Sequence, residues 1–77
     1  MVEQMNLRVE PMVHVRFEGQ SWDIACGILG VNDRSTDRNV RRALARYLDV
    51  PLRKLEPYVI ERHANGNLTV RPEAVYG

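Results

Sequence analysis

Only a few side chains of this sequence belong to the types that perform covalent catalysis. The 77 residues include one cysteine, Cys26, and two histidines, His14 and His63. A cysteine nucleophile needs a histidine within hydrogen-bond reach. In the first hairpin predicted below, His14 faces outward opposite Ala25, whereas Cys26 faces the core. We therefore interpret Cys26 as a small core residue, and His63, beside a turn, as a solvated strand residue.

A serine, an aspartate and a histidine share the outer face of the same predicted hairpin. Ser21, Asp23 and His14 are the residue types of a hydrolase triad. Ser21 is expected opposite Glu18, four residues along the strand from His14, which is roughly 13 Å at ~3.3 Å per residue. A hydroxyl cannot hydrogen-bond over that distance. The other acidic residues are scattered, so we predict no catalytic residue, no metal site and no cofactor, and a protein that is not an enzyme.

The second kind of chemistry in the sequence is ionic and is carried by arginine. Residues 33–54 contain seven cationic and three acidic side chains, a local charge of +4, whereas the whole chain carries only +1. Arginine suits the recognition of phosphate and carboxylate groups. A solvated surface, or a GC-rich genome, explains the same composition without any partner. The candidate face for a protein or nucleic-acid partner consists of Arg38, Arg41, Arg42 and Arg46.

These four arginines lie on the one helix that the sequence predicts clearly, over residues 36–48. Thr36 is the expected N-cap, with Ser35 as the alternative. Pro51 sets the far limit, because the residue before a proline is excluded from the helical region, and a short turn is expected over 51–56. At 100° per residue the apolar side chains fall on one arc and the arginines on the opposite arc. The face expected to be buried consists of Val40, Ala43, Leu44, Tyr47 and Leu48.

A hairpin is predicted over residues 13–24, before the helix. Apolar and polar residues alternate there, and Gly19-Gln20 suits a two-residue type II′ turn. The alternation places the aromatic and aliphatic side chains on one inner face. Residues 25–33 contain two glycines and are predicted to form a covered loop that closes one end of the core. The expected cross-strand pairs are Phe17 with Trp22, Val15 with Ile24 and Arg16 with Asp23.

A second hairpin is predicted after the helix, over residues 58–63 and 67–71. A two-residue turn at Asn65-Gly66 would mix its polar and apolar faces. A three-residue loop, Ala64-Asn65-Gly66, with Gly66 in the left-handed region keeps the faces separate. The expected pairs are Ile60 with Val70, Arg62 with Leu68 and Glu61 with Thr69.

The predicted order is therefore β-β-α-β-β. The fold class is α+β: a single globular domain over residues 12–77, with one amphipathic helix packed on a mixed four-stranded sheet. Residues 1–11 are predicted to be a flexible leader, and the sequence leaves open whether translation begins at Met1 or Met12. The apolar runs are too short for a membrane span, and the N-terminus lacks the signal-peptide pattern. We therefore expect a cytoplasmic protein without a membrane partner or a small-molecule substrate.

In element order, residues 13–71 resemble the β-grasp fold of ubiquitin and of the small sulfur-carrier proteins. The resemblance implies a non-enzymatic, ubiquitin-like module that binds another protein through an open strand or a sheet face. Those families act through an extended tail that ends in Gly-Gly. This chain ends in Val75-Tyr76-Gly77 after Pro72, so we do not expect conjugation or thiocarboxylate chemistry at its end.

Residues 43–55 also resemble a helix-turn-helix, in the spacing of alanine, leucine and valine. The second hairpin would then be a wing. Pro57 cuts the would-be recognition helix short, and Asp49 stands where such motifs favour glycine. The arginines lie on the first helix, which crosses the nucleic-acid backbone and does not read bases. Nucleic-acid binding by the arginine face is therefore the alternative function.

Overall fold

The structure is a computed structural model that describes residues 10–73. Residues 1–9 of the predicted leader lie outside the described residues. Residues 74–77 also lie outside them, so the expectation that Gly77 takes no part in conjugation or thiocarboxylate chemistry stays a prediction.

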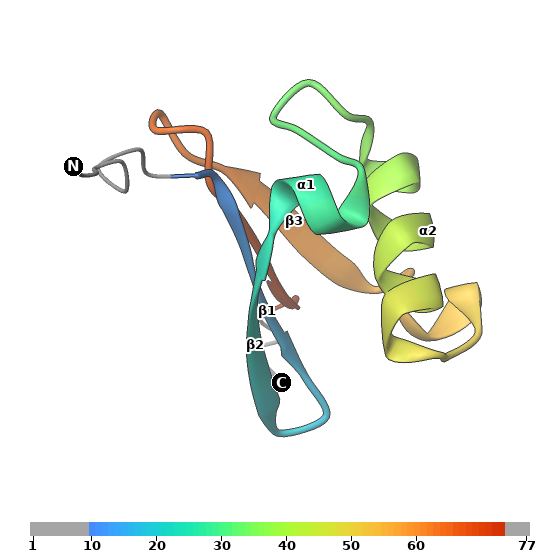
Figure 1. Cartoon of the computed structure of the whole chain (residues 1–77). Helices are drawn as coiled ribbons and strands as arrows, with labels where there is room; N and C mark the ends of the chain where they lie inside the picture. The colour runs from blue at the N-terminus through green and yellow to red at the C-terminus, as the bar shows by residue number, and fades with distance from the viewer. Residues whose placement is uncertain (1–9, 74–77) are drawn as a thin grey trace, which may run out of the picture.

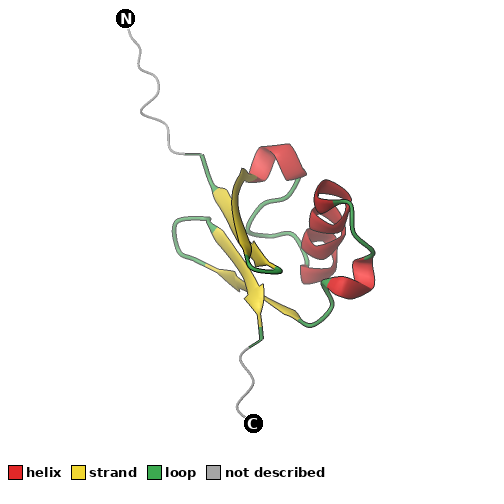
Figure 2. Cartoon of the chain, turned by 90° about the horizontal axis from the view of Figure 1, so that it is seen from below, coloured by secondary structure: helices red, strands yellow, loops and turns green. Residues whose placement is uncertain are grey.

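Two hairpins flank the main helix, and their four strands join in one mixed sheet. The sheet order is β2-β1-β4-β3, in which β1 and β4 are parallel neighbours and the two outer pairs are antiparallel. The helices lie on one face of this sheet (Figures 1 and 2). The predicted α+β class, with one main helix on a mixed four-stranded sheet, is confirmed. The elements are β1 (Met12–Phe17), β2 (Gln20–Ala25), α1 (Cys26–Leu29), α2 (Asp37–Leu48), the 3-10 helix η2 (Leu52–Lys54), β3 (Tyr58–Arg62) and β4 (Leu68–Pro72).

The register of the first hairpin differs from the predicted one. Glu18 and Gly19 form the turn, with φ of 51° and 81°. Two positive φ values are typical of a type I′ turn, whose twist matches that of the flanking strands. The predicted type II′ turn was therefore wrong, and the strands are shifted by two residues. A shift of two leaves every side chain on its predicted face, because the side-chain period of a strand is two. The actual pairs include Val13 with Ile24, Val15 with Trp22 and Phe17 with Gln20.

The second hairpin has the predicted register. Its pairs are Ile60 with Val70, Glu61 with Thr69 and Arg62 with Leu68. Gly66 has a φ of 91°, in the left-handed region that the three-residue loop requires. The prediction succeeded here because only one loop length kept the apolar side chains on a single face.

Helix α2 begins as predicted, but its buried face is rotated. The Thr36 hydroxyl accepts a hydrogen bond from the Asn39 N–H at 3.1 Å, which confirms the N-cap. The buried residues are Val40, Leu44 and Ala45, whereas Tyr47 is 49% exposed. The prediction that Tyr47 is buried was therefore wrong. The segment after Pro51 contacts α2, and its Leu52 lies beside Arg41, one turn before Ala45, so this side of the helix is covered while Tyr47 is not.

The core lies between α2 and the sheet. Cys26 is buried, which confirms its interpretation as a small core residue. The predicted loop over residues 25–33 contains a helical turn, α1, which Gly30 ends in a left-handed conformation. Ile28 in this turn is 69% exposed, so the expectation of a covered loop was wrong at that residue. The fully buried side chains are Leu44, Leu55, Leu68, Val13, Val15, Val40 and Val70.

The C-terminus of α2 offers a test of backbone strain. Asp49 adopts a left-handed conformation, with φ of 59°. Its N–H donates to the Arg46 carbonyl, and the Val50 N–H donates to the Ala45 carbonyl at 2.9 Å, as in a Schellman motif. Asp49→Gly should raise the free energy of unfolding by about 0.5–1 kcal/mol, because glycine relieves the strain and removes a negative charge from the negative end of the helix dipole.

Urea denaturation would measure this effect. Asp49→Asn is the matched control, since it removes the charge and keeps a side chain that tolerates the left-handed region. If Asp49→Gly were less stable than the wild type, the strain would not limit stability at this position.

Candidate functional site

Three of the four predicted arginines are exposed on α2. Arg38, Arg42 and Arg46 recur at every fourth residue, which is a rise of roughly 6 Å per step along the helix. The side chains of these three arginines make no hydrogen bond or ion pair with another residue in the described part of the chain. They are therefore available to a partner.

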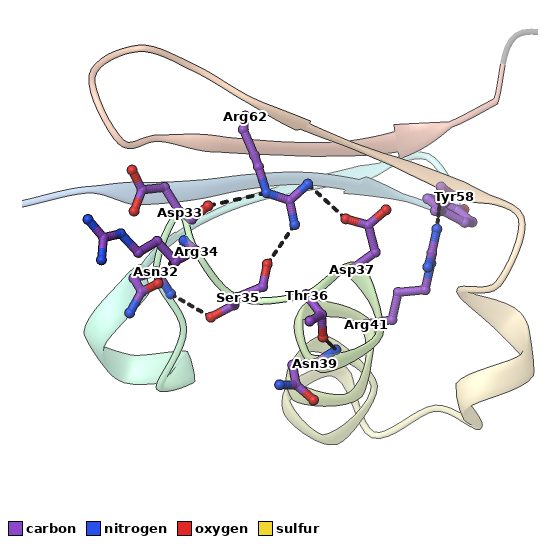
Figure 3. Close-up of polar contacts among 10 residues, drawn as sticks. All are labelled: Asn32, Asp33, Arg34, Ser35, Thr36, Asp37, Asn39, Arg41, Tyr58 and Arg62. Atoms are coloured by element: carbon purple, nitrogen blue, oxygen red, sulfur yellow. Dashed lines mark hydrogen bonds and ion pairs between the residues drawn. The ribbon is translucent and has the colours of Figure 1, made fainter.

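Arg41 is placed differently from the other three arginines. It is half-buried, and its Nη2 donates to the Tyr58 carbonyl at 2.8 Å (Figure 3). Its Nε is buried and has no hydrogen-bond partner. Arg41 therefore ties α2 to the start of β3. The sequence held a signal for this position, because Arg41 lies about 60° from Leu44 on a helical wheel and borders the edge of the apolar arc at Leu48, closer to it than the other three arginines.

A groove runs along the line where α1 and α2 meet, and we call it the α1–α2 groove. Figures 1 and 2 show these helices side by side. Two adjoining depressions of about 220 and 270 Å³ form the groove, and they share Leu29, Ala43 and Arg46. Its apolar end is lined by Ile28, Leu29, Ala43 and Tyr47. Its polar end adds Gly30, Val31, Ser35, Asn39 and Arg42.

The composition of the α1–α2 groove differs from that of three other depressions of the described surface. Ile28 and Tyr47 are the large hydrophobic residues that are exposed in residues 10–73, and both lie at its apolar end. No aspartate or glutamate lines either depression. Three other surface depressions each include an acidic residue: Asp23, Glu56 or Glu18. The groove therefore combines apolar surface with unopposed positive charge.

Arg62 of β3 holds the loop that borders the polar end of the groove. Its Nη2 donates to the Ser35 carbonyl at 2.6 Å, and its Nε donates to the Asp33 carbonyl at 3.3 Å (Figure 3). Its Nη1 forms an ion pair with the Asp37 carboxylate at 2.7 Å. Within the loop, the Asn32 side chain accepts from the Arg34 N–H at 2.7 Å. These contacts position Ser35 in the groove wall.

The open face of the sheet carries polar residues that pair with one another. His14 lies opposite Asp23, and their Nδ1 and Oδ1 atoms are 2.7 Å apart. The predicted pairing of His14 with Ala25 was wrong, because of the register shift. Ser21 lies opposite Arg16, and its hydroxyl makes no hydrogen bond with a described residue. The structure therefore links His14 to Asp23 but does not extend this link to Ser21.

A second polar group on the same face involves β3 and β4. The His63 Nε2 and Thr69 Oγ1 atoms are 2.7 Å apart. Arg71 donates to Glu61 at 2.8 Å, and this hydrogen bond, together with the Arg71 charge, lowers the pKa of the Glu61 carboxyl. On this face Glu61 and Arg71 therefore lie as an opposite-charge pair, in contrast to the arginines of the groove.

Cys26 shows no sign of an activated thiol. Burial raises the pKa of the Cys26 thiol, and the carboxylates of Glu10 and Asp33 raise it further. A thiol with a raised pKa stays protonated and is a weak nucleophile. Among residues 10–73, no group of three or more histidine, cysteine, aspartate or glutamate side chains is placed to hold a metal ion.

No protein-family model, curated protein or solved structure gives a significant match to this chain. Its function is therefore inferred from its own surfaces. In the part of the chain that the structure describes, no helix has both the length and the apolar character to cross a membrane.

The sequence predicted two residues of the groove, Arg42 and Arg46, and missed its apolar end. Ile28 was assigned to a covered loop and Tyr47 to the core. On the helical wheel Ala43 lies at one edge of the apolar arc, but Tyr47 lies as close to its centre as Leu44 does, so the periodicity of the helix gave no signal that Tyr47 is exposed.

Proposed function

We propose that the protein is a small, non-enzymatic module of β-grasp type, and that it binds another protein through the α1–α2 groove. The observation that carries the proposal is the meeting of Ile28 and Tyr47, both exposed, in one groove edged by Arg42 and Arg46. The β-β-α-β-β order and the central parallel pair of strands support the β-grasp resemblance. A cytoplasmic location belongs to the same proposal.

The chemistry of the groove fits a protein partner. Tyrosine and arginine are enriched among the residues that dominate binding energy at protein interfaces. Burial of the exposed parts of Ile28 and Tyr47 would contribute on the order of 1–2 kcal/mol each. The neighbouring arginines would add orientation through hydrogen bonds to acceptor groups. An apolar centre with a charged rim is the usual organisation of such an interface.

The second candidate function is nucleic-acid binding by Arg38, Arg42 and Arg46. Their exposure and their lack of described partners favour it. Such binding would neutralise phosphates, independently of base sequence, and would weaken steeply with salt. An amide NMR titration with a mixed-sequence duplex, at low and at physiological salt, would test it. Shifts at these arginines that salt reverses would favour nucleic acid over protein.

A capture experiment tests the docking proposal. The groove variant Ile28→Asp/Tyr47→Ser should retain at most about one tenth of the partner protein that the wild type retains, because each substitution removes an exposed side chain that the interface would bury. The control variant Gln20→Ser/Ser21→Asp has the same charge change at two exposed residues outside the groove. It should retain the wild-type amount. Retained proteins would be compared by quantitative mass spectrometry after nuclease treatment.

Two outcomes would contradict the docking proposal. The groove variant could retain the same proteins as the wild type, or nuclease could release everything that the wild type retains. The second outcome would favour the arginine face and a nucleic acid. Both substituted side chains are exposed, so the variant should stay folded, which its thermal melt would verify.

A further inference from the structure

We infer that the segment that occupies the α1–α2 groove is an acidic amphipathic helix of the partner protein. This inference rests on the proposed function of the groove and names the chemical class of its ligand. The partner helix places an apolar side chain in the end formed by Ile28, Leu29 and Tyr47. It places a carboxylate at the end formed by Arg42 and Asn39.

Charge complementarity argues for the acidic character of the partner. Arg46 borders both halves of the groove, and Arg42 borders its polar end. Neither arginine pairs with a described acidic residue. Carboxylates form short, charge-assisted hydrogen bonds with guanidinium groups, and these can be bidentate. A basic partner would instead meet two like charges with no acidic residue in the lining to offset them.

The walls of the groove argue for a helical partner over an extended one. One wall is α2, whose mid-helix backbone groups are already hydrogen-bonded within the helix, and the other wall is the single turn α1 with residues of the loop that follows it. An extended segment needs a free strand edge to pair with. The outer strands of this sheet are β2 and β3, and neither contributes a residue to the groove. A helix satisfies its own backbone and can pack its side chains into the groove.

The dimensions of the groove set the spacing of the partner's side chains. Along α2, the apolar end lies at Ala43 and Tyr47, and the polar end lies at Asn39 and Arg42. The two ends are about one helical turn apart, roughly 6 Å. The matching partner therefore carries an apolar residue and an acidic residue three or four positions apart on one face.

Synthetic peptides test this inference with the full chain. The first peptide has about 18 residues, long enough to form a helix, and carries leucines with glutamates one turn away. In the second peptide lysines replace the glutamates, and in the third two prolines break the helix. In an amide NMR titration at physiological salt, only the first peptide should bind. The residues expected to shift are Ile28, Leu29, Ala43, Arg46 and Tyr47.

A charge swap makes the test specific to the groove. Arg42→Glu/Arg46→Glu should weaken binding of the glutamate peptide at least about fivefold and should create binding of the lysine peptide. The control Arg38→Glu/Arg53→Glu carries the same charge change outside the groove lining and should bind like the wild type. A gain of binding to the lysine peptide cannot result from unfolding, so the charge swap distinguishes a change in recognition from a loss of stability.

Several results would overturn the inference. Two of them concern affinity: the lysine peptide, or the proline peptide, could bind as tightly as the glutamate peptide. Two concern the amide chemical shifts: they could change only on the open face of the sheet, or they could change with protein concentration in the absence of peptide. The last result would mean that a second copy of this chain covers the groove. If none of the peptides binds, but the variant Ile28→Asp/Tyr47→Ser still captures less partner than the wild type, the helix inference is wrong and the docking proposal stands. If the groove variant captures normally, the docking proposal itself fails.

Discussion

Leu44→Asp should abolish the cooperative unfolding transition. Leu44 is 0% exposed and lies in the middle of α2, over the sheet. Replacing a buried leucine with alanine already costs about 2–5 kcal/mol. An aspartate at this site would add an unpaired carboxylate to an apolar core, which costs more. A domain of this size has a total stability of roughly 4–12 kcal/mol, so the substitution removes most or all of it.

Thermal melts followed by far-UV circular dichroism and by Trp22 fluorescence would measure this loss. Trp22 packs against the core, so its fluorescence reports on tertiary structure. Asn39→Asp introduces the same carboxylate on the exposed side of α2, and Arg42→Ala removes an exposed side chain. Both controls should change stability by no more than about 0.5 kcal/mol. A cooperative melt of Leu44→Asp near the wild-type temperature would show that α2 does not bury this face.

Arg62→Ala should give the second largest loss, about 1–2 kcal/mol in the free energy of unfolding. Arg62 donates charged hydrogen bonds to the Asp33 and Ser35 carbonyls, and such bonds are worth more than neutral ones. Its ion pair with Asp37 adds little, because the two side chains are 34% and 48% exposed and water screens them. The loss should therefore depend only weakly on salt concentration.

Hydrogen exchange would locate the effect of Arg62→Ala. Amide exchange should accelerate over residues 32–36, the loop that Arg62 holds, and hardly change in β1 and β4. Arg62→Lys should recover only part of the loss, because an ammonium lacks the planar fork that reaches three acceptors. Arg16→Ala, a change at an exposed arginine on the open face, is the control and should exchange like the wild type. Unchanged exchange over residues 32–36 in Arg62→Ala would show that other contacts hold the loop.

The loop held by Arg62 also connects stability to the groove. Ser35 lines the polar end, and its carbonyl accepts from Arg62. If the groove binds an acidic helix, Arg62→Ala should weaken that binding even though Arg62 does not line the groove. Arg62→Ala should lower both stability and binding, whereas Arg42→Ala should lower binding with little change in stability, so the structural role of Arg62 and the recognition role of Arg42 are separable by experiment.

The sequence alone determined the features that depend on local chemistry and on periodicity. The Thr36 cap, the left-handed Gly66 and the register of the second hairpin follow from backbone preferences and from the need to keep apolar side chains on one face. The inner face of the first hairpin was also predictable, although its pairs were not. Glu18-Gly19 and Gly19-Gln20 turns both keep the same side chains inside, so the period of two could not choose between them.

Only the tertiary structure decided which side of α2 faces water. A helical wheel gives an apolar arc but not the neighbours that cover its two edges. The segment after Pro51 lies beside Arg41, which is half-buried and bonded to Tyr58, whereas the short helix α1 leaves Tyr47 exposed next to Ile28. The charge of the groove could therefore be predicted from the spacing of Arg42 and Arg46. Its apolar end could not, because burial depends on packing between segments that are distant in the sequence.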